Sequence, residues 1–140
     1  MTYDEVVDMI KKHEGFSEKL YLDTVGVLTG GWGHAFFVGD YIPFYIWEKL
    51  LWLDIKEAYD DLEKLKLNND LDEVRKAVVV DMLFNIGLTK FLGFKKLIAA
   101  LRKKDYEEAA KEMKDSKWAK QVKSRTTELI KMMKTGEVCK

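Results

Sequence analysis

Residues 13–34 read HEGFSEKLYLDTVGVLTGGWGH, and this stretch decides how the rest of the chain is interpreted. It sets one acid, Glu14, at the end of a short amphipathic segment and a second acid, Asp23, on a glycine-punctuated turn. Two carboxylic acids in different surroundings can hold different pKa values, so that one stays protonated while the other stays ionised. The chemistry that such a pair favours is cleavage of a glycosidic bond.

The segments around this stretch predict an α+β fold that is predominantly helical. Thr2 and Glu5 have the spacing of a capping box for a helix over residues 2–13, which Gly15 ends. Residues 19–35 are β-branched and aromatic residues broken by glycines, which predicts a small antiparallel hairpin or three-stranded sheet. A sheet of this size is not stable alone, so it must pack against helices.

The remainder of the chain predicts helices. Pro43 suits the first turn of a long helix that runs to about Leu65. Residues 77–84 are apolar except for Asp81, which predicts a buried core helix that ends at Gly87. The further predicted helices cover residues 94–102, residues 106–114 capped by Asp105, a short helix capped by Ser116, and a last helix from Ser124 to Gly136.

The length of 140 residues fits one compact domain with two lobes. We expect a small β-sheet lobe over residues 13–42 and a helical lobe made of residues 1–12 and 66–140. The long helix over residues 43–65 connects them.

Composition narrows the possible partners and location. The formal net charge of +0 gives no global attraction for nucleic acid. Cys139 is the only cysteine, so no intramolecular disulfide forms, and synthesis in the cytoplasm is favoured. The amino terminus lacks the apolar core of a signal peptide, and no stretch is long and apolar enough for stable membrane insertion.

At this point the chain resembles the phage-type lysozymes, glycoside hydrolase family 24, over most of its length. No single motif would suffice, but their order and spacing together are specific. The resemblance implies a lysozyme-like fold, in which a small N-terminal β-sheet lobe is joined by a long helix to a helical C-terminal lobe. The matching residues are Glu14-Gly15, Tyr21, Asp23-Thr24, Gly26, Thr29, Gly31, Gly33-His34, Leu71-Asp72, Val74-Arg75, Phe84, Gly87, Glu108-Ala109-Ala110, Ser116, Trp118, Ser124-Arg125 and Thr135-Gly136.

The resemblance implies a muramidase that hydrolyses the β-1,4 bond between N-acetylmuramic acid and N-acetylglucosamine in bacterial peptidoglycan, without a cofactor. The acid that matches Glu14 protonates the leaving oxygen, and the residues that match Asp23 and Thr29 organise the attacking water. An inverting reaction of this kind needs carboxyl groups roughly 6.5–9.5 Å apart, which leaves room for that water.

Supporting roles also follow from the resemblance. Arg125 is expected to reach the catalytic glutamate and position it, and His34 is expected to pair with Asp54 on the long helix. Phe84 and Asn85 are candidates to contact the substrate, because aromatic and amide groups suit N-acetyl sugars. A metal site is not expected, since the sequence has no cluster of Cys and His residues.

We therefore expect a monomeric endolysin of phage, prophage or bacterial origin, antimicrobial through lysis of the host cell. It would be made in the cytoplasm, without a signal peptide, and would act on peptidoglycan in the periplasm after release by a holin-type partner. Two alternatives stay open. One is a non-catalytic cell-wall-binding or virion structural module that retains the fold, and the other is a helical interaction domain with an exposed apolar patch at residues 35–47.

The chain departs from the family pattern in the segment 35–43, which is shortened and makes a reduced, apolar cleft wall. Ala35, Leu97 and Glu112 stand where relatives contact sugar through other side chains, so subsite contacts do not carry over. Gly30, beside Thr29, is expected to leave its strand looser.

Overall fold

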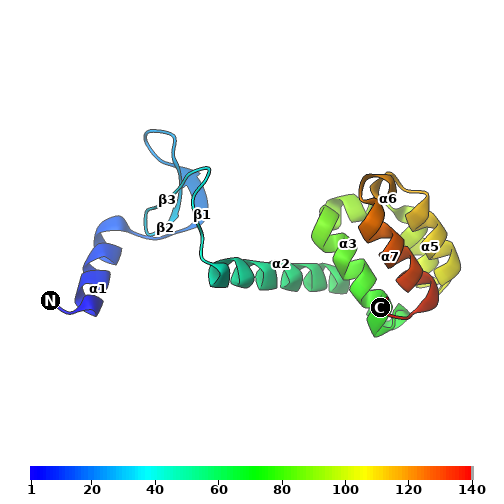
Figure 1. Ribbon diagram of the computed structural model, residues 1–140. Helices are drawn as coiled ribbons and strands as arrows, with labels where there is room; N and C mark the ends of the chain where they lie inside the picture. Colours follow the sequence, from blue (N-terminus) through cyan, green and yellow to red (C-terminus); the bar gives the residue numbers. More distant parts are fainter. Residues whose placement is uncertain (140) are drawn as a thin grey trace. The chain divides into compact units, whose positions relative to one another are not determined.

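The computed structural model describes residues 1–139 and divides the chain into two compact units. The amino-terminal unit spans Met1–Phe44, and the carboxy-terminal unit begins at Tyr45. Among the described residues, the first unit holds one helix and three strands, and the second is helical (Figure 1). This content confirms the predicted α+β, predominantly helical, lysozyme-like class. The lobe boundaries stay a prediction.

Helix α1 (Tyr3–Glu14) begins with the predicted capping box. Thr2 Oγ1 accepts the Glu5 N–H at 3.2 Å, and Glu5 Oε2 accepts the Thr2 N–H at 2.7 Å. The helix ends at Gly15, which has a φ of +70° and donates its N–H to the Lys11 carbonyl. Because both ends are fixed by contacts within a few residues, the sequence predicts the bounds of this helix well.

The predicted sheet has three antiparallel strands, β1 (Ser17–Leu22), β2 (Leu28–Gly31) and β3 (His34–Phe36), in the order β1-β2-β3. Thr29 on the central strand pairs with Tyr21 and with Ala35. The expectation of a looser strand at Gly30 stays a prediction. A Cβ on that residue would lie 2.7 Å from Leu20 Cδ2, so the Leu20 side chain already fills the space.

Helix α2 (Phe44–Lys64) begins directly after Pro43, as predicted. Only its carboxy-terminal half is buried, through Ala58 and Leu62. Its amino-terminal half and the segment before it expose large apolar side chains. These are Phe37, Val38, Tyr41, Phe44, Tyr45, Trp47 and Trp52.

The core of the carboxy-terminal unit forms around α3 (Glu73–Phe91). Val78, Val79 and Met82 are fully buried, as the apolar run predicts. Gly87, with a φ of +81°, breaks the helical backbone where the sequence predicts an end. The short 3₁₀ helix η1 (Asn68–Asp70) precedes α3.

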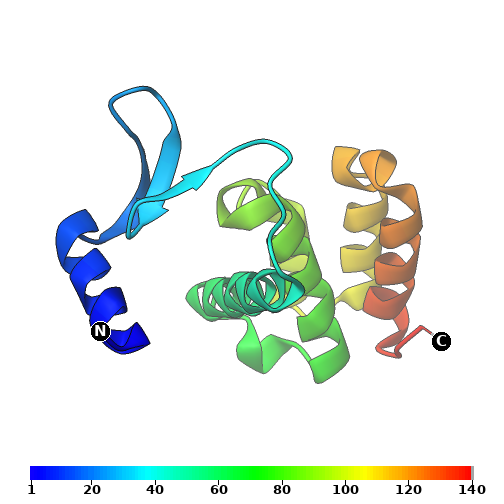
Figure 2. The ribbon, with the colours of Figure 1, turned by 60° about the vertical axis from the view of Figure 1, so that its left-hand side comes forward.

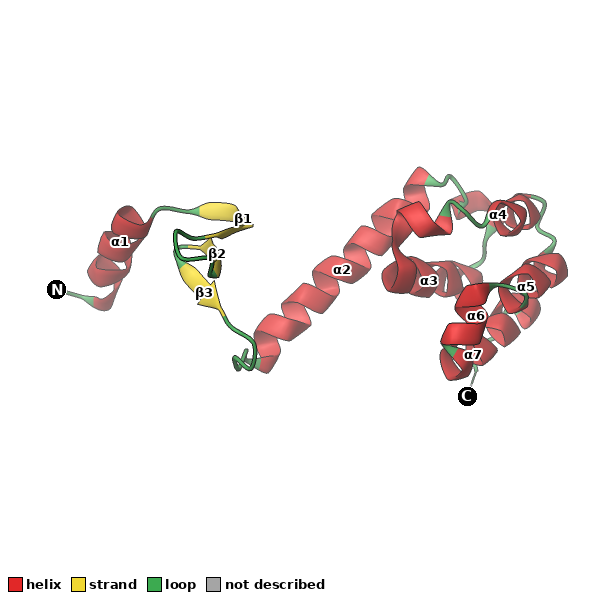
Figure 3. Cartoon of the chain, turned by 90° about the horizontal axis from the view of Figure 1, so that it is seen from above, coloured by secondary structure: helices red, strands yellow, loops and turns green. Residues whose placement is uncertain are grey.

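Four helices complete this unit: α4 (Lys95–Arg102), α5 (Tyr106–Lys114), α6 (Lys117–Gln121) and α7 (Lys123–Thr135). Helices α5 and α7 lie side by side, and α3 packs on α7 (Figures 2 and 3). The predicted caps Asp105 and Ser116 are confirmed. The predicted start of the last helix at Ser124 is wrong by one residue, since α7 begins at Lys123. Val122 ends α6 and also precedes α7, and its side chain makes no capping hydrogen bond that would mark this start in the sequence.

Arg75 joins the beginning of α3 to the end of α7. Its Nε donates to the Met133 carbonyl at 2.7 Å and its Nη2 to the Lys134 carbonyl at 3.1 Å. Its Nη1 pairs with Asp72 Oδ2 at 2.6 Å, and its guanidinium lies 3.8 Å from the ring centre of Tyr106 on α5. The last carbonyls of a helix lack partners within the helix, so a guanidinium there satisfies groups that otherwise need water.

No single helix of the described residues is long and apolar enough to cross a membrane, and only α3 and α4 taken together, across a bend of 117°, meet the length and composition required.

We expect the substitution Arg75→Met to lower the free energy of unfolding by about 2–3 kcal/mol, because it removes several hydrogen bonds to a charged group. Chemical denaturation measures this loss. Arg102→Met is the matched control, since Arg102 makes one hydrogen bond, to the Leu65 carbonyl, and we expect it to cost less than about 1 kcal/mol. Equal losses of unfolding free energy in the two variants would contradict the proposal that Arg75 stabilises the unit by joining α3 to α7.

Asp72 should make stability depend on acid pH. Burial opposes its ionisation, but hydrogen bonds from the Arg75 backbone and guanidinium, together with the Arg75 charge, outweigh burial and lower the pKa of Asp72 below 3.8. A lowered folded-state pKa stabilises the fold above the unfolded-state value, and this contribution is lost as pH falls through the folded-state value. The difference in unfolding free energy between the native chain and Asp72→Asn should therefore be fully present at about pH 6, decrease as pH falls below 3.8 and disappear once pH is below the lowered folded-state pKa of Asp72. A difference that is independent of pH would exclude this ionisation as its cause.

Candidate active site

Glu14 is the last residue of α1, and its side chain reaches the turn between β2 and β3. A Cβ on Gly33 would lie 2.7 Å from Glu14 Oε2 and 3.2 Å from Glu14 Cδ. Gly33 also has a φ of +71°, a conformation that glycine adopts at little cost. Gly33 therefore lets the Glu14 carboxylate lie directly against the backbone of the turn.

Asp23 sits at the tight turn that joins β1 to β2. Its Oδ1 accepts the backbone N–H groups of Val25 at 2.9 Å and Val27 at 2.8 Å. Its own N–H donates to the Val27 carbonyl at 2.9 Å, and the Gly26 N–H donates back to the Asp23 carbonyl. One carboxylate oxygen is thus fixed by the turn, while Oδ2 has no hydrogen bond to the part of the chain that the structure describes.

Thr29 lies on the central strand, with 5% of its surface exposed. Its hydroxyl donates to the Val27 carbonyl at 2.9 Å. A hydroxyl that donates one hydrogen bond still accepts others. Val27 therefore binds both predicted water-organising residues through its backbone, Asp23 by its N–H and Thr29 by its carbonyl.

Glu14, Asp23 and Thr29 all lie in the amino-terminal unit. His34, also in this unit, starts β3 and presents an exposed ring edge-on to Phe36, with ring centres 4.6 Å apart. Its predicted partner Asp54 belongs to the other unit, so the pair stays a prediction.

In the carboxy-terminal unit, Asp54 and Phe84 line one groove between α2 and α3. The groove has a volume of about 440 Å³, and two further acids, Glu57 and Asp61, line it. Phe84 is 40% exposed, so its ring is open to a ligand rather than part of the core.

Asn85 is exposed, but its carbonyl already has a partner. Asn85 Oδ1 accepts the indole N–H of Trp118 at 2.8 Å. This hydrogen bond fixes the orientation of the side-chain amide, because an indole N–H only donates. The NH₂ group of Asn85 thereby stays available as a donor.

Arg125 pairs with a residue that the sequence interpretation had not assigned to the site. Arg125 Nε donates to Asp81 Oδ1 at 2.6 Å, which joins α7 to α3. The signal for Asp81 was present in the sequence, where it is the one charged residue in the apolar run 77–84. A buried helix face tolerates a carboxylate when a partner compensates its charge.

Comparison with known proteins identifies the family. Residues 11–134 match the model of the phage lysozyme family. The chain belongs to this family. It is 27% identical to probable T4-type lysozyme 1 of Dictyostelium discoideum over 160 aligned positions, which cover 94% of each protein. It is also 27% identical to probable T4-type lysozyme 2 of the same organism over 158 positions, which cover 92% of this chain and 93% of the relative.

Membership of the phage lysozyme family makes this chain a lysozyme-like protein of the glycoside hydrolase type. The matched region includes Glu14, Asp23, Thr29 and Arg125. Their individual roles remain those that the sequence resemblance predicts.

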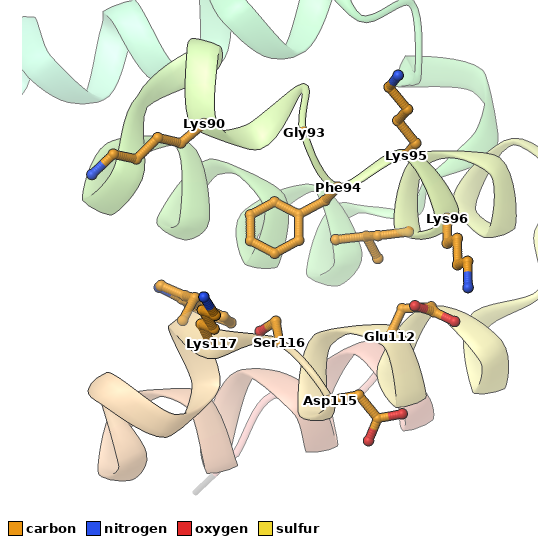
Figure 4. Close-up of a pocket in the computed structure, with 11 residues that line it drawn as sticks. Lys90, Gly93, Phe94, Lys95, Lys96, Glu112, Asp115, Ser116 and Lys117 are labelled. Atoms are coloured by element: carbon orange, nitrogen blue, oxygen red, sulfur yellow. The ribbon is translucent and has the colours of Figure 1, made fainter.

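A second pocket of this chain, with a volume of about 610 Å³, lies among α3, α4, α5 and α6 (Figure 4). Phe94, Leu97 and Trp118 supply its apolar lining, and the pocket is also lined by positively and negatively charged side chains. The charged residues are Lys90, Lys95, Lys96, Lys117, Glu112 and Asp115. Trp118, which lines this pocket, also donates its indole N–H to Asn85 Oδ1.

Within residues 1–139, no group of three or more His, Cys, Asp and Glu side chains is arranged to hold a metal ion.

We expect Gly33→Ala to displace the Glu14 side chain, because the new methyl group would lie 2.7 Å from Glu14 Oε2. Gly31→Ala is the matched control, since Gly31 also has positive φ, +60°, but has open space around its Cβ position. Both variants should lose about 1 kcal/mol of stability through backbone strain. Only Gly33→Ala should move the side-chain carboxyl resonance of Glu14 in the NMR spectrum, and an unmoved resonance would disprove the contact.

Proposed function

We propose that this chain is a muramidase that cleaves the β-1,4 bond between N-acetylmuramic acid and N-acetylglucosamine in bacterial peptidoglycan. The observation that carries the proposal is the arrangement of the amino-terminal unit. There Glu14 lies against the Gly33 turn, while Val27 binds both Asp23 and Thr29. Family membership and the T4-type lysozyme relatives support the same class of reaction.

In this proposal Glu14 is the general acid that protonates the leaving oxygen. A general acid and a general base together typically accelerate such reactions by orders of magnitude, provided that each reaches its proton. Asp23 and Thr29 organise the attacking water. The free Oδ2 of Asp23 and the remaining acceptor capacity of the Thr29 hydroxyl suit that task.

We further propose that the reaction inverts the anomeric configuration, since a bound water, rather than Asp23, attacks the sugar. Arg125, His34 and Asp54 keep the supporting roles that the resemblance implies. Phe84 and Asn85 contact the glycan, which the exposed Phe84 ring and the oriented Asn85 amide favour.

The biological setting belongs to the same proposal. The chain would act as a monomer on peptidoglycan strands of the periplasm in lysis of a host cell, after synthesis in the cytoplasm and release by a holin-type partner. Nucleic acid has no part in this function, in keeping with the balanced net charge of +0.

We expect Glu14→Gln to reduce lysis of chloroform-treated Gram-negative cells by at least about 100-fold, because it removes the general acid. Turbidity measures lysis, and circular dichroism shows that the variant is folded. Glu18→Gln is the matched control, since Glu18 is an exposed acid on β1, and it should lyse as the native chain does. Undiminished lysis by Glu14→Gln would refute the assignment of Glu14. A folded native chain that binds insoluble peptidoglycan without cleaving it would instead favour the non-catalytic wall-binding module.

The stereochemistry has its own test. NMR of the first products of peptidoglycan-fragment hydrolysis should show the α-anomer at the new reducing end, because the water attacks from the face opposite the β-linked leaving group. The β-anomer as first product would indicate a retaining mechanism and would remove the water-organising role from Asp23.

A further inference from the structure

Two exposed aromatic rings lie in contact within the amino-terminal unit. The ring centres of Phe16 and Trp32 are 4.6 Å apart, with an angle of 38° between the ring planes. Phe16 is 59% exposed and Trp32 is 46% exposed, so both rings are open to solvent. Phenylalanine and tryptophan side chains are mostly buried in folded proteins, so an exposed pair needs an explanation beyond packing.

The loop that carries Trp32 does not itself require a tryptophan. Trp32 lies between Gly31 and Gly33, which have positive φ values of +60° and +71° and shape the turn from β2 to β3. Tight turns favour glycine, asparagine, aspartate and proline for their backbone preferences, and an aromatic residue adds nothing to these. The Trp32 ring is nevertheless held in place, because Lys11 Nζ of α1 lies 4.8 Å from its centre.

The segments that place the two rings also place Glu14. Phe16 follows Glu14 by two residues, so their Cα atoms are at most about 7 Å apart. Trp32 directly precedes Gly33, the residue against which the Glu14 carboxylate lies. The two rings and the carboxylate are therefore close neighbours in one unit.

We propose that Phe16 and Trp32 form a platform that binds one sugar ring of the glycan strand, next to the bond that is cleaved. This inference rests on the proposed function, in which Glu14 protonates the leaving oxygen. A general acid must come within about 3 Å of the atom that it protonates, so the sugars joined by that bond lie beside Glu14 and its aromatic neighbours.

The chemistry of the platform suits an N-acetylated pyranose. One face of such a ring carries C–H groups, which pack on the electron-rich face of an aromatic ring. The edge of the sugar carries hydroxyl and carbonyl groups, and the ammonium of Lys11, beside Trp32, supplies hydrogen-bond donors to them.

The alternative is a purely structural pair that holds the loop between β2 and β3 against the end of α1. Loss of a structural pair lowers stability and leaves glycan binding by the folded chain unaltered. Loss of a platform weakens the binding of substrate and transition state alike, which raises KM and leaves kcat nearly constant.

Kinetics on soluble peptidoglycan fragments separates these outcomes. We expect Phe16→Leu and Trp32→Ala each to raise KM about tenfold, with kcat within twofold of the native value. Phe16→Leu keeps an apolar side chain that supports the fold but removes the flat ring. Trp32→Phe restores a ring and should keep KM within about twofold of the native value. Circular dichroism shows which variants are folded.

Tyr3→Ala is the matched control, because Tyr3 is an exposed aromatic residue of the same unit at the opposite end of α1. It should leave KM and kcat at the native values. A KM for folded Phe16→Leu within twofold of the native value, in an active native chain, would overturn the inference.

A second readout does not require activity. In Glu14→Gln, a soluble peptidoglycan tetrasaccharide should shift the indole N–H resonance of Trp32, which is identified by its absence from the spectrum of Trp32→Phe. Adding Phe16→Leu to Glu14→Gln should weaken this binding about tenfold in calorimetry. If the native chain proves inactive, the proposed function fails, and this titration alone decides the inference. No binding, or binding that leaves the Trp32 resonance unmoved, would overturn it, and the expected shift would support it.

Discussion

The carboxy-terminal unit depends on the guanidinium of Arg75. It binds the last carbonyls of α7, pairs with the residue that caps α3 and lies over an aromatic ring of α5, so three helices far apart in the sequence meet at one side chain. Helix α3 also carries Asp81, and α7 carries Arg125. Arg75 and the second ion pair therefore join the same two helices at different points along them.

The two units present their functional groups by different means. In the amino-terminal unit, Asp23 and Thr29 are held by backbone groups, two N–H groups and a carbonyl, and Glu14 lies against a glycine. In the carboxy-terminal unit, Asn85 and Arg125 are held by other side chains, Trp118 and Asp81. Substitutions of side chains therefore disturb the second set more directly than the first.

The sequence predicted those parts of the structure that depend on near neighbours in the chain. The capping box at Thr2, the caps Asp105 and Ser116 and the helix break at Gly87 each depend on contacts within a turn or two. The start of α7 was missed because Val122 offers no capping side chain. The pairing of Asp81 with Arg125 joins residues far apart in the sequence, and single-residue preferences carry no information about such a partner.

Val27 gives the amino-terminal site a property that its residue type does not reveal. Its N–H binds Asp23, and its carbonyl binds Thr29, whereas its valine side chain takes part in neither contact. A single residue thus links the two groups, because the Asp23 carboxylate and the Thr29 hydroxyl are hydrogen-bonded to the same short piece of main chain. Every amino acid except proline supplies the same two backbone groups, so these two hydrogen bonds do not require a valine. The residue type at position 27 therefore does not reveal that its backbone links Asp23 to Thr29.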